Sequence, residues 1–143
     1  GLIYDPRRRS PGMDEPDAPA TVRWLLVVAV AAVLAVAAVV RPGQGVGELG
    51  PLGLLTLDLW LHAAGYAALQ AVVIFALVGG RRPPATPVRL TPVATVSYGL
   101  LLEGVQFLLA YRSFSVADAI ANTAGILAVL LAYELLLAAV PDS

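Results

Sequence analysis

The residues of this sequence that could do chemistry are polar side chains within its most apolar regions. They are Asp58, His62, Tyr66, Glu103, Gln106, Arg112, Ser115, Asp118 and Asn122. Carboxylates, amides and an imidazole together could bind a cation, move a proton or ligate a metal ion. Because an ionisable group inside a membrane-length segment costs about 2.5 to 3.5 kcal/mol on insertion, these groups indicate a functional site.

The spacing of these residues places them on common helix faces. Residues four apart on an α-helix lie on one face, about 6 Å apart along the axis, and residues three apart are also neighbours. Three groups meet this rule: Asp58, His62 and Tyr66; Glu103 and Gln106; Asp118 and Asn122. We expect all of them to point into the protein, because a polar side chain facing lipid has no partner.

The composition predicts that the elements carrying these residues lie in a membrane. Hydrophobic residues make up 59% of the 143 residues and charged residues only 13%, and the mean hydropathy is +0.81. This leaves too little polar surface for a water-soluble globule. The net charge of -1 gives no reason to expect a nucleic-acid partner, and the lack of cysteine excludes disulfides and thiolate chemistry.

Four apolar stretches approach the roughly 20 residues needed to cross a bilayer. They cover residues 22–40, 57–78, 90–110 and 116–140. We therefore predict an all-α polytopic membrane protein, a bundle of four transmembrane helices within residues 21–143, preceded by a mobile cytoplasmic tail over residues 1–20. The first stretch is too long for a signal peptide and has no clear cleavage point, so we expect an uncleaved span. The short loop 111–115 predicts that the last two helices are antiparallel.

The arginines predict the orientation of this bundle. The chain has nine basic residues. Seven lie before or at the very start of the first span, or in the second loop: Arg7, Arg8, Arg9, Arg23, Arg81, Arg82 and Arg89. By the positive-inside rule, both termini are cytoplasmic in a multi-pass protein of the cell membrane. All the polar groups then lie at one depth in the outer half of the membrane, where Arg112 could fold back over them.

Three motifs carry a resemblance to a known family. They are Asp58-Leu-Trp-Leu-His62-Ala-Ala-Gly-Tyr66, Glu103-Gly-Val-Gln106 and Arg112-Ser113-Phe-Ser115-Val-Ala-Asp118-Ala-Ile-Ala-Asn122-Thr-Ala-Gly125. In order and spacing they resemble the signature of VanZ-like membrane proteins, a family named for its association with teicoplanin resistance. Leu59 and Val129 depart from that signature, which usually has a lysine and often a small residue there. The resemblance implies the four-helix fold and a role of the glycopeptide-resistance kind, but no particular reaction.

Three functional classes fit the polar cluster. In the one we favour, an outward-facing pocket binds a polar or charged head group of an envelope lipid or lipid-like amphiphile, with Asp58, Glu103 and Asp118 supplying negative charge and Arg112 available for a phosphate. In the second, His62 and these carboxylates ligate a metal ion in an intramembrane enzyme. No dedicated metal motif is present, and we expect no cofactor. In the third, the cluster is only the ion-paired core of a small bundle that serves as a structural subunit or scaffold. A homo-oligomer is left open under every class.

Structural roles compete with functional ones at individual residues. Asp58 and Asp118 could cap the second and fourth helices, and Ser115 could begin the fourth. Glu103 could form an internal ion pair with Arg112 or His62. Two glycines, Gly104 and Gly125, could let helix backbones approach closely.

Overall fold

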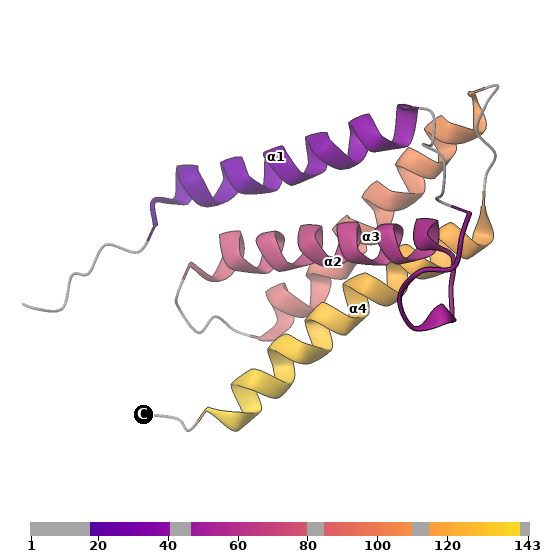
Figure 1. The fold of residues 1–143 in the computed structure, drawn as a ribbon. Helices are drawn as coiled ribbons and strands as arrows, with labels where there is room; N and C mark the ends of the chain where they lie inside the picture. Colours follow the sequence, from indigo (N-terminus) through magenta and orange to yellow (C-terminus); the bar gives the residue numbers. More distant parts are fainter. Residues whose placement is uncertain (1–17, 41–46, 80–84, 110–114, 141–143) are drawn as a thin grey trace, which may run out of the picture.

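A computed structural model describes residues 18–40, 47–79, 85–109 and 115–140 of the chain. These residues form α1 (Ala20–Val39), α2 (Leu57–Val78), α3 (Ala85–Phe107) and α4 (Val116–Ala139), with a short 3-10 turn, η1 (Pro51–Gly53), before α2. The predicted all-α fold is confirmed (Figure 1). The tail predicted over residues 1–20 falls almost wholly outside the described residues, as do Arg112 and Ser113.

Three of these helices are long and apolar enough to cross a membrane: α1, α2 and α4. On α1 the apolar side chains are largely uncovered, with Val33 68% and Val28 62% exposed, as expected of a helix that faces lipid. The helix α3 has sufficient length, at 23 residues, but it carries more polar side chains than the others. The chain is therefore a membrane protein, and a spanning α3 stays a prediction.

The ends of α2 and α4 are fixed by local capping. The hydroxyl oxygen of Thr56 accepts a hydrogen bond from the backbone N–H of Leu59 (3.4 Å) and begins α2. Ser115 does the same for Asp118 (3.2 Å) and begins α4, as predicted. The prediction that Asp58 caps α2 and Asp118 caps α4 is wrong for the capping position, which Thr56 and Ser115 occupy. Each aspartate lies in the first turn of its helix, where the helix dipole favours its charge. Gly79 ends α2 in the left-handed region, with φ of 56°.

The start of α3 differs from its prediction. The helix begins at Ala85 rather than at residue 90, so Arg89 belongs to the helix and Pro87 lies in its first turn, where a missing N–H breaks no hydrogen bond. Pro92 lies further inside and cannot donate to the carbonyl of Val88. The Thr91 hydroxyl donates to that carbonyl instead (2.6 Å), which explains how the helix continues through Pro92.

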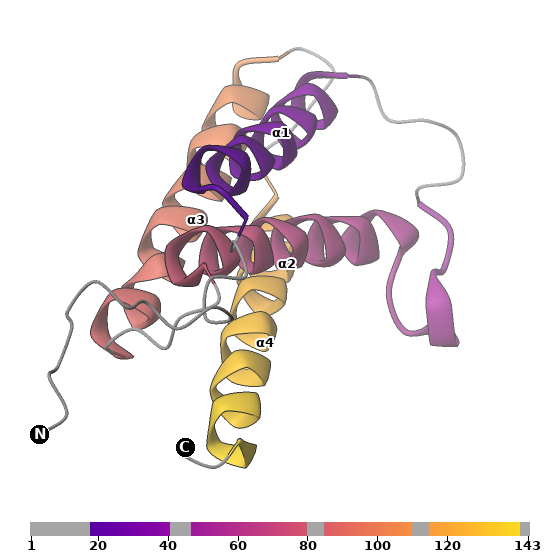
Figure 2. The same ribbon diagram turned by 90° about the vertical axis from the view of Figure 1, so that its left-hand side faces the viewer.

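The helix α2 lies at the centre of the fold and contacts each of the other three helices. The two views show α1 along one side of α2 and α4 crossing it on the other, with α3 inclined to both (Figure 1, Figure 2). Between α2 and α3, the buried amide of Gln70 donates to Thr91 (2.7 Å) and accepts from Thr95 (2.8 Å). This network satisfies every buried polar group that it joins, so it fixes how α3 packs on α2.

A close backbone approach lies between α2 and α4. Gly125 is buried, and a Cβ atom added there would collide with the carbonyl group of Ala63. The prediction that Gly125 permits a close helix contact therefore holds for this residue. At Gly104, by contrast, an added Cβ meets nothing within 4 Å.

We expect Gly125→Ala to lower the free energy of unfolding by about 1 to 3 kcal/mol, because the methyl group must push α4 away from α2. The matched control is Gly104→Ala, whose added methyl group has open space and favours the helix. Unfolding of the purified protein in mixed micelles measures both changes. Equal stability of the two variants would show that α2 and α4 do not pack as described.

Candidate functional site

His62, on α2, lies at the centre of the polar cluster and contacts both the first turn of its own helix and α4. Its Nδ1 atom is 2.9 Å from the side-chain oxygen of Asn122. Because an amide oxygen only accepts, Nδ1 donates its hydrogen in this contact. Its Nε2 atom lies 3.7 Å from Oδ1 of Asp58 and 3.5 Å from Oδ2 of Asp118. The imidazole is therefore oriented by an amide and directed at two carboxylates.

The local structure explains why these side chains meet. Asp58 and Asp118 each lie in the first turn of their helix, α2 and α4 respectively, where the helix dipole favours a negative charge. His62 follows Asp58 by one turn, as the sequence predicted. The contact between Gly125 and Ala63 brings the two helices together beside this turn. The two aspartates thus face the same imidazole from separate helices.

Glu103 and Gln106 face the interior from α3. Glu103 is 1% exposed and Gln106 is 4% exposed. The Gln106 amide donates to the carbonyl of Ala38 at the end of α1 (3.1 Å), and Oε2 of Glu103 accepts from the backbone N–H of Ser115 (3.5 Å). The ion pairs of His62 in the described part of the structure are with the two aspartates, which does not support the predicted alternative of a pair with Glu103.

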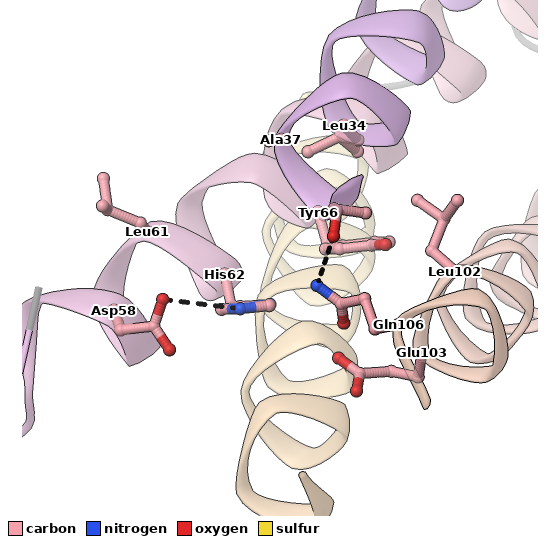
Figure 3. A pocket seen from close by; sticks show the side chains of 10 residues that line it. Leu34, Ala37, Asp58, Leu61, His62, Tyr66, Leu102, Glu103 and Gln106 are labelled. Carbon is pink, nitrogen blue, oxygen red and sulfur yellow. Dashed lines mark hydrogen bonds and ion pairs between the residues drawn. The ribbon is translucent and has the colours of Figure 1, made fainter. Parts of the chain in front are cut away.

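A pocket of about 200 Å³ opens between α1, α2 and α3. We call it the interhelical pocket (Figure 3). Its lining residues are Leu34, Ala37, Ala38, Asp58, Leu61, His62, Tyr66, Leu102, Glu103 and Gln106. In the close view the Glu103 carboxylate points from α3 toward α2, and Asp58 and His62 lie across from it (Figure 3). The pocket therefore combines polar groups with apolar walls.

The structure divides the predicted site residues into two groups that share His62. One group lines the interhelical pocket: Asp58, His62, Tyr66, Glu103 and Gln106. The other lies on α4, where Asp118 and Asn122 contact His62 without lining the pocket. Ser115 caps α4 and also reaches Glu103 through its backbone N–H. The prediction for Arg112 lies outside the described residues.

Two parts of this region were missed by the sequence analysis. The first is the wall that α1 contributes through Leu34, Ala37 and Ala38; nothing distinguishes these residues within a uniform Ala/Val/Leu run. The second is Gln70, which lies four residues after Tyr66 and is fully buried. Its spacing continues the face formed by Asp58, His62 and Tyr66, so this signal was present in the sequence.

The structure brings together three of the four predicted metal donors. One ligand atom each from Asp58, His62 and Asp118 lie within 4.8 Å of one another. Among the described residues this is the group that could hold a metal ion, and Glu103 does not belong to it. One nitrogen and two oxygen donors suit a divalent ion of hard or borderline character.

No family model, curated protein or solved structure matches this chain. The VanZ-like resemblance therefore rests on its three motifs and stays a prediction. The geometry of the cluster and its pocket carries the functional argument.

A double-mutant cycle tests the contact on which this geometry depends. We expect His62→Ala and Asn122→Ala to be coupled by about 0.6 kcal/mol, and by no more than about 1.7 kcal/mol, the range of interhelical hydrogen bonds in membranes. Unfolding of the four proteins in mixed micelles measures the coupling. His62→Ala with Gln70→Ala is the control cycle, because no contact joins these two side chains, and it should be additive. Additivity in both cycles would contradict the His62–Asn122 contact.

Proposed function

We propose that this chain is a four-span protein of the cell membrane whose interhelical pocket binds the polar or positively charged head group of a membrane lipid or lipid-like amphiphile. Both termini are cytoplasmic in this proposal, and the pocket faces outward. The single observation that carries the proposal is the mixed lining of the pocket, which pairs carboxylate, imidazole and amide groups with apolar side chains.

The two kinds of lining residue match the two parts of an amphiphile. Asp58, His62 and Glu103 offer charge and hydrogen bonds, while Leu34 and Leu102 offer apolar contact. The volume of about 200 Å³ holds about six or seven waters at about 30 Å³ each, which is the size of a compact head group. A lipid whose tails lie along the exposed faces of the helices could place its head group here.

The charge of the lining favours a positively charged occupant. Asp58 and Glu103 supply carboxylates from two helices, and the side chain of Asp58 is 35% exposed. The ring of Tyr66 adds an aromatic surface of the kind that attracts quaternary and primary ammonium groups. An ammonium head group therefore fits this lining better than an anionic one.

The resemblance to VanZ-like proteins supports the same proposal. Of its motif residues, Asp58, His62, Tyr66, Glu103 and Gln106 all line the pocket. A role of the glycopeptide-resistance kind would follow if an occupant of the pocket alters how an amphiphilic compound enters or acts at the envelope. A purely structural ion-paired core explains the contacts of His62 but does not require a cavity beside them.

Lipid selectivity tests the proposed pocket. We expect native mass spectrometry of protein released from mixed nanodiscs to show retained phosphatidylethanolamine in preference to phosphatidylglycerol. Glu103→Gln should reduce this preference about tenfold, equivalent to about 1.4 kcal/mol, because it removes a charge while keeping the shape of the side chain. The matched control is Glu134→Gln, which changes an exposed carboxylate paired with Arg89 outside the pocket. Equal retention of both lipids by the unaltered protein would contradict the proposal.

Cysteine labelling tests the proposed orientation, because the chain contains no cysteine of its own. We expect Leu54→Cys, at an exposed position before α2, to react with a membrane-impermeant maleimide in intact spheroplasts. Ala85→Cys, at the exposed start of α3, should react only after the membrane is opened. The reverse labelling pattern would show that the topology is the opposite of the proposed one and that the pocket faces the cytoplasm.

A further inference from the structure

The spacing of the donor atoms around His62 points to a metal ion rather than to direct hydrogen bonds. Nε2 lies 3.5 Å from Asp118 and 3.7 Å from Asp58, whereas charge-assisted N–H···O bonds are about 2.7 to 2.9 Å long. With metal–ligand bonds of about 2.0 to 2.2 Å, donors around a tetrahedral ion lie about 3.3 to 3.6 Å apart. The 3.5 Å separation falls within this range and the 3.7 Å separation lies just above it, and the three ligand atoms together lie within 4.8 Å of one another.

The orientation of the imidazole supports the same conclusion independently. Asn122 accepts the hydrogen of Nδ1 at 2.9 Å, so Nε2 is the ring nitrogen left to bind an ion in the space between the two carboxylates. Metal-ligating histidines characteristically donate their other ring N–H to such an oxygen acceptor, which fixes both tautomer and ring position. Asn122 is 4% exposed, and a buried amide of this kind is an outer-shell group for a metal ligand.

We propose that Asp58, His62 and Asp118 bind a divalent cation of the zinc or manganese class. One imidazole and two carboxylates suit ions of borderline or hard character, and the two negative charges balance the ion. Three protein ligands leave at least one coordination position for water or an added oxygen ligand. Asp58 and His62 also line the interhelical pocket, so the ion site borders the pocket.

The metal site and the head-group proposal share Asp58 and His62, but each also needs a residue that the other does not use. Glu103 lines the pocket but is not in the donor group, and Asp118 is in the donor group but does not line the pocket. Variants at these two positions therefore separate the proposals. Loss of lipid selectivity in Glu103→Gln with unchanged ion binding would show that Glu103 acts in the pocket and not in the metal site.

The chain is unusually well suited to a direct test because His62 is its single histidine. The protein is prepared with a tag free of histidine, labelled with ¹⁵N-histidine and titrated with Zn²⁺. We expect one equivalent to bind by calorimetry, with a shift of the Nε2 resonance and little change at Nδ1. This readout uses the unaltered protein, so it does not depend on whether a variant folds.

Variants then assign the remaining ligands. Asp118→Asn should weaken Zn²⁺ binding at least about tenfold, and Asn122→Ala should weaken it by about 10- to 100-fold as an outer-shell change. Glu134→Gln, which changes an exposed carboxylate paired with Arg89 outside the pocket and the donor group, should bind Zn²⁺ as the unaltered protein does. An unmoved Nε2 resonance, or unchanged affinity in a folded Asp118→Asn protein, would overturn the proposal.

Discussion

The contact between α2 and α4 at Gly125 is the constraint on which the polar cluster depends. Because Gly125 has no side chain, the carbonyl group of Ala63 can lie directly against α4. Ala63 follows His62 in α2, and Asn122 precedes Gly125 by one turn in α4. The same approach that brings the backbones together therefore brings the imidazole to Asn122 and Asp118.

His62 joins two surroundings that differ in chemistry. On one side it faces α4, where a carboxylate and an amide orient the ring. On the other it borders the interhelical pocket, whose farther wall holds Glu103. An occupant of the pocket that contacts His62 or Asp58 therefore also changes the electrostatic environment of Asp118, which faces His62 from α4. This arrangement favours a binding site over a set of unrelated interhelical contacts.

The fold was predictable from the sequence to the extent that apolar length determines it. The second span was predicted over residues 57–78 and is observed at Leu57–Val78, because turn residues bound the apolar run at both ends. The start of α3 was missed since its first turn tolerates Pro87 and its polar residues weaken the apolar signal. Helical spacing also placed Asp58, His62 and Tyr66 on one face, and all three line the pocket.

Which helix faces pack against each other was not predictable from the sequence, because this packing depends on how the helices cross. Nothing in the sequence places Glu103 on the pocket and Asp118 on the opposite side of His62. That division follows from the packing of Gly125 against Ala63 and from the Gln70 network between α2 and α3. The wall from α1 was equally hidden, since it consists of alanine and leucine in a uniform run.

The central claim is that His62 lies in an accessible site rather than in a sealed ion-paired core. The most direct measurement is the rate at which diethyl pyrocarbonate modifies this single histidine in proteoliposomes freed of divalent cations by a chelator, located by mass spectrometry of the digested protein. The side chain is 16% exposed, and Nε2, the atom that would react, faces the aspartates beside the pocket. The account predicts modification of the folded protein at a substantial fraction of the rate in the unfolded chain. Modification only after unfolding would contradict it.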